Sequence, residues 1–91
     1  MKIAHKIRKM DYFRGEAWLF RMDPPYEEHD YVIVSAIDLH FVRYGGSETC
    51  MFAATPQGGV KDWMQLPGSF QGGKDIPRAL RNAGYEIEET P

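Results

Sequence analysis

The stretch of this chain that comes nearest to a site for chemistry is GSFQGGKD, residues 68–75. It is one residue away from the phosphate-binding pattern G-x-x-x-x-G-K-[ST], in which a glycine-rich loop cradles phosphates and the hydroxyl holds magnesium. Asp75 stands where that hydroxyl is needed, and the chain that follows it is too short for the parallel βαβ units of such enzymes. The stretch is therefore interpreted as a turn into a helix that is capped by Asp75 or Ile76, with a nucleotide-binding loop as the alternative.

The metal-binding residue types are widely spaced. The available soft ligands are His5, His29, His40 and Cys50. No two of them have the close spacing of a zinc site. His40 and Cys50 are predicted to lie on adjacent rungs of a hairpin, where side chains point to opposite faces. We expect no metal site and no cofactor.

The carboxylates do not form an acid–base pair that could work in catalysis. They cluster at Glu27 and Glu28 and again at residues 86–89, both in polar or terminal segments where solvation keeps the pKa of a carboxyl ordinary. A cysteine in the middle of a strand, as Cys50 is predicted to be, is typical of a small buried residue rather than a nucleophile. We therefore expect a protein that is not an enzyme.

Two aromatic residues are candidates for contact with a partner protein. Trp63 and Phe70 flank a bend at residues 66–68, and a small sheet has limited space to bury 5 Phe, 5 Tyr and 2 Trp. Exposed aromatic residues beside a glycine-rich loop are typical anchors of protein interfaces. The alternative is that Trp63 closes the core under the helix.

The charge of the chain is unevenly distributed. Residues 1–10 hold four cations, Lys2, Lys6, Arg8 and Lys9, whereas the whole chain has a net charge of −2. The body is therefore acidic. This segment is predicted to be a flexible tail or a short helical turn, and its Lys6, Arg8 and Lys9 are candidates for contact with nucleic acid. A solvated chain end without a partner is the alternative.

Length and composition indicate one small soluble domain. The chain has 91 residues, of which 43% are apolar and 26% charged. Its single cysteine cannot form an internal disulfide, which fits a reducing compartment. No apolar run has the length of a membrane span or the character of a signal peptide, so we expect no membrane association and a cytoplasmic location.

The hydrophobic pattern predicts strands followed by one helix. The expected elements are strands at 16–22, 31–43, 48–54 and 60–66, a helix at 76–83 and a short strand at 85–89. Both faces of residues 31–39 are apolar, as in a central strand. Pro24-Pro25 ends the first strand, and a two-residue turn at Gly45-Gly46 places Phe41 opposite Cys50. Gly84 ends the helix.

These elements define an α+β fold. We expect an antiparallel β-meander of about four or five strands with one C-terminal α-helix packed on one face. Residues 11–91 make up the domain and residues 1–10 form the basic N-terminal segment. One helix covers one face of a sheet, so the second apolar face of residues 31–39 needs another cover. The candidates are the N-terminal segment and a second copy of the chain, as in a homodimer.

The order of several short motifs resembles small uncharacterised proteins encoded by bacteriophages of actinobacteria, including mycobacteriophages. The motifs are YFRGEA at 12–17, MDPPYE at 22–27, HDYVIVSA at 29–36, DW at 62–63, LPGSF at 66–70 and ALRNAGYE at 79–86. They cover most of residues 11–89, whereas residues 1–10 are less similar. The resemblance carries no known active site.

The resemblance implies a role directed at the host cell, because such phage proteins often act on host proteins. We therefore expect a non-enzymatic module that binds or modulates a host protein in the host cytoplasm. A nucleic-acid-binding accessory domain that uses the basic N-terminal segment is the second hypothesis. A nucleotide binder that uses residues 68–75 is the third.

Overall fold

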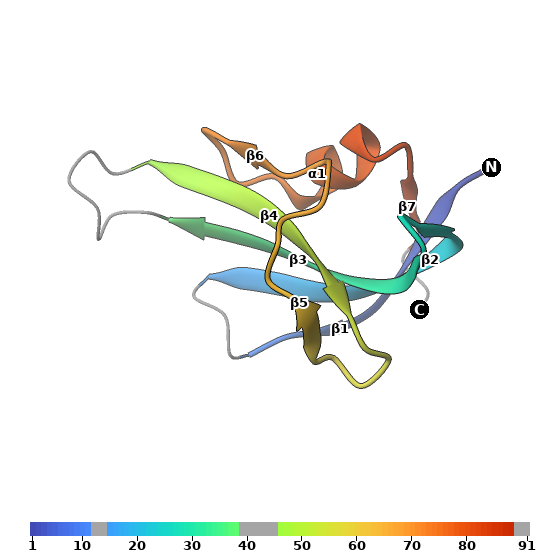
Figure 1. Ribbon diagram of the computed structural model, residues 1–91. Coiled ribbons are helices and arrows are strands. Elements are labelled where there is room, and N and C mark those ends of the chain that lie inside the picture. The colour runs from blue at the N-terminus through green and yellow to red at the C-terminus, as the bar shows by residue number, and fades with distance from the viewer. Residues whose placement is uncertain (12–14, 39–45, 89–91) are drawn as a thin grey trace.

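Strand β3 (His29–Asp38) lies at the centre of the fold. In the computed structural model, which describes residues 1–11, 15–38 and 46–88, it is antiparallel to β2 (Glu16–Tyr26) and to β4 (Ser47–Ala54). The remaining elements are β1 (Ile3–Lys9), β5 (Val60–Asp62), β6 (Phe70–Gln71), α1 (Ile76–Asn82) and β7 (Glu86–Glu88). The strand order is β5-β4-β3-β2-β1-β7, and β6 also pairs with β4 (Figure 1). The fold is α+β, with one short helix on a mixed sheet.

One face of the sheet packs against α1, and we call it the helix side (Figure 1). Its buried residues come from β1 to β4, from the helix and from the segment after it. They are Ala4, Phe20, Met22, Val32, Val34, Ala36, Met51, Ile76, Ala79, Leu80, Ala83 and Tyr85. Each large apolar side chain fully buried here stabilises the fold by roughly 1.5–3 kcal/mol. The predicted helix on one face is confirmed.

Local signals at both ends fix the position of the helix. The carboxylate of Asp75 accepts a hydrogen bond from the backbone N–H of Arg78 (3.0 Å), so Asp75 rather than Ile76 is the N-cap. Pro77 lies in the first turn, where its missing N–H costs nothing. Gly84 follows the helix with a φ of +91°, a conformation that glycine adopts without strain.

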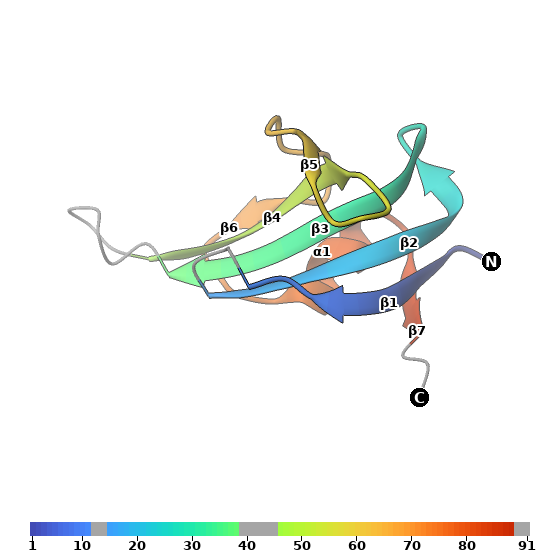
Figure 2. The ribbon, with the colours of Figure 1, turned by 90° about the horizontal axis from the view of Figure 1, so that it is seen from below.

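The opposite face, which we call the turn side, is covered by the hairpin between β4 and β5 (Figure 2). Its buried cluster consists of Met10, Ala17, Leu19, Ile33 and Ala54. The turn at residues 55–59 reaches the end of β1, where the Arg8 guanidinium donates a hydrogen bond to the carbonyl oxygen of Gln57. The sequence predicts that the N-terminal segment or a second copy of the chain covers this face. The N-terminal segment contributes Met10 to the cluster. Burial of this cluster requires no second copy of the chain.

The outer edge of β4 is covered in sections. β5 pairs with the end of β4 and β6 with its beginning. Between them, the backbone N–H of Met51 donates to the Ser69 hydroxyl (2.9 Å), and its carbonyl accepts from the N–H of Leu66 (2.8 Å). A sheet edge whose backbone groups are satisfied in this way is protected against pairing with another chain.

The N-terminal segment is a strand, so the expected flexible tail or helical turn at residues 1–10 is wrong. β1 pairs with β2, and its Ile3–His5 portion also pairs in parallel with β7. The ladder with β2 shifts register between Lys6 and Arg8, which places a bulge at Ile7. A bulge interrupts the two-residue alternation that identifies a strand in a sequence. For this reason the sequence pattern does not indicate β1.

The hairpin between β3 and β4 has another register than the predicted one. Cys50 pairs with Ser35 rather than with Phe41, so the connection is longer than a two-residue turn at Gly45-Gly46. Residues 39–45, which include the predicted continuation of the strand and His40, lie outside the described residues.

The strand count also exceeds the predicted four or five, because the described residues form seven strands. β2 continues through Pro24-Pro25, although the sequence predicts that these prolines end the strand. The ladder between β2 and β3 is interrupted from Arg21 to Tyr26, so no N–H group is required from either proline. The predicted strand at residues 60–66 is shorter and ends at Asp62.

The turn between β2 and β3 supports a test of backbone strain. Glu27 and Glu28 have φ angles of +50° and +69°, the pattern of a type I′ turn, which strongly favours Asn-Gly. We expect Glu28→Gly to raise the free energy of unfolding in urea by about 0.5–1 kcal/mol. The left-handed conformation costs a non-glycine residue about 1–2 kcal/mol, more than the extra freedom of glycine in the unfolded chain. Glu86→Gly, in extended β7, should lower stability, and a similar loss for Glu28→Gly would contradict the prediction.

A second test concerns the closure of the turn side at Gly58. A Cβ atom on Gly58 would lie 2.7 Å from Nη2 of Arg8 and 2.7 Å from Cε of Met10, and its φ is +95°. Gly72 has a similar φ of +91° but open space around it, which makes Gly72→Ala the matched control. We expect Gly58→Ala to reduce the free energy of unfolding by up to about 1 kcal/mol more than Gly72→Ala, because the ends of the Arg8 and Met10 side chains must move aside in addition to the same backbone strain. Equal losses would show that the turn does not contact β1 in solution.

Candidate functional site

The predicted anchor Trp63 lies on a short loop that leaves the edge of the sheet. After β5, the carboxylate of Asp62 accepts a hydrogen bond from the backbone N–H of Met64 (2.9 Å), a side-chain turn that bends the chain outward. The chain returns to the edge at Leu66, whose N–H donates to Met51. The residues between these two points, Trp63, Met64 and Gln65, are all exposed and are called the Trp63 loop.

The side chains of the Trp63 loop expose apolar surface on a supported platform. Trp63 is 62% exposed and Met64 is 74% exposed. The Trp63 ring contacts the buried Phe52 edge to face, with ring centroids 5.3 Å apart and an interplanar angle of 66°. Phe52 pairs with Ile33, so this contact lies on the turn side. Trp63 therefore does not close the core under the helix, which is on the other side.

Phe70, the second predicted anchor, lies on the helix side and is only partly exposed. It packs against the helix-side cluster, and the guanidinium carbon of Arg78 lies 4.4 Å from the centre of its ring. The structure thus separates Trp63 from Phe70, and the two do not form a single surface.

The predicted basic residues are also divided between the two sides. Lys6 pairs with Phe20 and Lys9 with Trp18, both helix-side neighbours, whereas Arg8 pairs with Leu19 of the turn side. Side chains of paired residues lie on the same face of a sheet. Lys6 and Lys9 therefore point to the helix side and Arg8 to the turn side.

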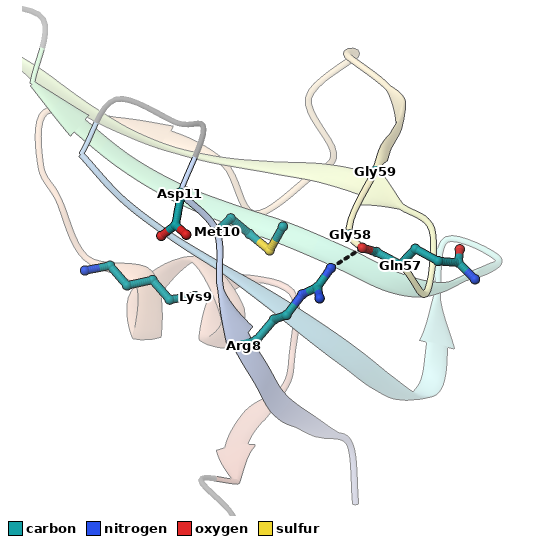
Figure 3. A pocket seen from close by; sticks show the side chains of 7 residues that line it. All are labelled: Arg8, Lys9, Met10, Asp11, Gln57, Gly58 and Gly59. Atoms are coloured by element: carbon teal, nitrogen blue, oxygen red, sulfur yellow. Dashed lines mark hydrogen bonds between the residues drawn. The ribbon is translucent and has the colours of Figure 1, made fainter.

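An open groove of about 620 Å³ separates the end of β1 from the turn that covers it (Figure 3). Arg8 spans this groove through its hydrogen bond to Gln57, and Lys9 points away from that contact in Figure 3. Asp11 lies in the same groove and offsets part of the positive charge. The groove lies where two parts of the sheet meet. Its lining includes cations, a carboxylate and the backbone of two glycines.

The loop at residues 68–75 is held by contacts within the chain. The Lys74 ammonium forms an ion pair with the carboxylate of Asp38 (2.9 Å), and the Asp75 carboxylate caps the helix. The hydroxyl of Thr49 donates to the carbonyl of Gly73 (3.0 Å) and accepts from the N–H of Asp75 (2.9 Å). The polar groups of this motif that favoured a phosphate loop thus connect the loop and the start of the helix to β3 and β4.

Within the part of the chain that the structure describes, no three His, Cys, Asp or Glu side chains come together as a metal site would require. His5 lies between two carboxylates, with Nε2 4.0 Å from Asp23 and Nδ1 3.7 Å from Glu88. This arrangement joins β1 to both of its neighbours. The described helix is also too short to cross a membrane.

The comparisons with known proteins give no relative for this chain: no family model, curated protein or solved structure matches it.

Met64 is the residue of this site that sequence reasoning missed. The sequence predicts that Met64 belongs to a strand that runs to residue 66, whereas β5 ends at Asp62. One signal was present, since Trp63 and Met64 are adjacent. In a strand, adjacent side chains point to opposite faces, so an edge strand would leave one of them exposed.

Cys50 provides a test of how well the turn side is closed. It is 3% exposed, and its burial raises the pKa of the thiol to about 12, with the Glu48 carboxylate adding to the rise. We expect negligible alkylation of the native protein by iodoacetamide between pH 7 and 9 and rapid alkylation in urea, because the thiolate is the reactive form. The raised pKa also implies that stability declines above about pH 9, where the thiol ionises in the unfolded chain but not in the folded one. A native thiol as reactive as the unfolded one would contradict this burial.

Proposed function

We propose that this protein is a non-enzymatic binding module that contacts a partner protein through the Trp63 loop. The observation that carries the proposal is the adjacent exposure of Trp63 and Met64 at 62% and 74%. Apolar surface that is exposed to water is unfavourable, and two large apolar side chains that lie side by side gain free energy when a partner surface buries them.

The geometry around Trp63 supports an anchor rather than a mobile side chain. The ring contacts Phe52, and the loop is fixed on both sides by hydrogen bonds of Met64 and Leu66. A rigid aromatic ring loses little conformational entropy on binding, which is one reason why Trp is enriched among the residues that dominate binding energy. Methionine beside it adapts to irregular apolar surfaces.

The class of partner follows from the resemblance of the chain to actinobacterial phage proteins. A host protein, met in the host cytoplasm, is the partner that we propose, and the role of the complex is to modulate that host protein. A second copy of this chain is the alternative occupant of the Trp63 loop. Analytical ultracentrifugation distinguishes the two, since a homodimer would sediment as such without any host component.

The test is affinity capture from the producing cells with three proteins: the wild type, Trp63→Ala/Met64→Ala, and Ile7→Ala. Ile7 is 47% exposed on β1, so its substitution is a control for general loss of apolar surface. We expect one or more host proteins to be retained by the wild type and by Ile7→Ala, and to be lost from the double variant, with affinity reduced at least tenfold. A central Trp anchor typically contributes 2 kcal/mol or more, roughly a thirtyfold change in affinity.

Folding of the double variant must be checked by thermal unfolding, because Trp63 also contacts Phe52. The loss of thermal stability should be small, since most of the Trp63 side chain is exposed in the native protein. Identical sets of captured proteins for all three proteins would refute the proposal, and so would the absence of any specifically retained protein.

A further inference from the structure

The helix side of β1 carries a row of three lysines. Lys6 and Lys9 point to this side by their pairing with Phe20 and Trp18, and the ammonium of Lys2 lies 5.6 Å from the centre of the Tyr85 ring on the same side. Lys2, Lys6 and Lys9 are called the lysine row. It was not visible in the sequence, where Arg8 was grouped with these residues.

Trp18 lies within the lysine row. Its cross-strand partner is Lys9, and the ammonium of Lys6 lies 3.8 Å from the centre of its ring. The indole N–H donates to the carboxylate of Glu16 (2.9 Å), which fixes the orientation of the ring. Trp18 is only partly buried, and it packs against the helix-side cluster.

The described carboxylates of β7 lie on the other side of the sheet from the lysine row. Ile87 of β7 pairs with Ala4 and packs on the helix side, so the flanking Glu86 and Glu88 belong to the turn side. The contact of Glu88 with His5 agrees with this placement. On the helix side, Glu16 of β2 is a carboxylate next to the row, and it accepts the hydrogen bond of Trp18.

A shallow groove of about 220 Å³ lies between α1 and β7 at one end of the lysine row. It is lined by Pro77, Arg81, Tyr85, Glu86 and Ile87, so it holds one cation and one carboxylate. Lys2 lies over the Tyr85 ring, which places the groove next to the lysine row. The positive charge on this side therefore comes from the lysine row itself.

We infer that the lysine row, together with Trp18, is a binding site for single-stranded nucleic acid. Single-strand binding sites recurrently combine two features. Cations in a line contact the phosphate backbone, and an aromatic ring among them stacks on a base. An acidic peptide would also be attracted by the lysines, but it would make no particular use of the tryptophan. The combination of row and ring therefore favours the nucleic acid.

Binding would exchange the partners of Lys6 without any change in the fold. In the structure its ammonium covers the Trp18 ring. On binding, the ammonium moves to a phosphate and a base takes its place on the ring, which forms a charge-assisted contact and a stacking contact. Glu16 keeps the ring in position during this exchange.

The experiment measures binding of a fluorescein-labelled oligothymidylate of about 12 nucleotides, a length within the range of known single-strand sites. Fluorescence anisotropy is recorded between about 50 and 200 mM salt. Each phosphate contact on a single strand contributes about 0.7 to the slope of log affinity against log salt, so the three lysines predict a slope of about −2. We expect Lys6→Gln/Lys9→Gln to weaken binding roughly tenfold at low salt and to reduce the slope toward that of one contact.

The matched control is Arg21→Gln/Lys61→Gln, which removes the same charge from exposed residues outside the lysine row. It should leave the affinity within about twofold, since Arg21 lies on the turn side, where it pairs with Tyr31, and Lys61 lies on β5 at the other edge of the sheet. Stacking is followed separately in Trp63→Phe, which leaves Trp18 as the single tryptophan of the chain. Its fluorescence should be quenched on addition of the oligonucleotide.

Four results would overturn the inference: no binding at low salt, an equal loss in the two double variants, a clear preference for duplex DNA, or unchanged Trp18 fluorescence in the bound state. Polyglutamate is included as a competitor. If it binds with the same dependence on Lys6 and Lys9, the lysine row recognises acidic protein and the assignment to nucleic acid is wrong. Thermal unfolding confirms that each variant is folded, so that loss of binding is not loss of structure.

Discussion

The constraint on which this structure depends is the apolar character of both faces of β3. Val32 and Val34 must be covered on one side and Ile33 on the other, and all three are fully buried. The described residues supply one helix for the purpose, so the second cover is built from the sheet itself. The hairpin between β4 and β5 curls over the turn side and reaches β1, and this curl determines where the surface loops are placed.

The small size of the core also explains the positions of the aromatic residues. In a small core, large rings reach the rim, where their polar ends find partners: the Tyr85 hydroxyl donates to the Pro24 carbonyl (2.5 Å) and the Tyr26 hydroxyl to the Pro67 carbonyl (2.7 Å). Two rings without a hydroxyl are contacted by cations, since Lys6 lies over Trp18 and Arg78 over Phe70. A surplus of aromatic residues in a sequence is therefore not the same as a surplus of exposed ones.

The elements that depend on local chemistry could be predicted from the sequence. The central strand follows from its continuous apolar run, and the helix from Asp75, Pro77 and Gly84 at its ends. The register of the β3–β4 hairpin could not be predicted in the same way. Its displacement is by an even number of residues, which leaves every side chain on the face that the alternation assigns, so only packing between distant segments distinguishes the two registers.

The candidate site was predictable in part. The composition around the bend at residues 66–68 indicated Trp63, but not that it lies across the sheet from Phe70. The division of Lys6 from Arg8 depends on the bulge at Ile7 and on pairing with β2, neither of which has a sequence signature. Side-chain type is local information, whereas the face on which a residue lies depends on its partner strand.

The pairing of β7 with β1 joins the two ends of the described chain, which Figure 1 shows near each other. On the ribosome the first strand emerges early, but the strand that completes its outer edge, together with Tyr85 of the core, emerges last. Synthesis proceeds at about 5–20 residues per second, so the early strands wait for seconds with apolar surface uncovered. Parallel pairing between distant segments also slows the final step of folding. The outer edge of β1 therefore stays unpaired until β7, the last described strand, has been made.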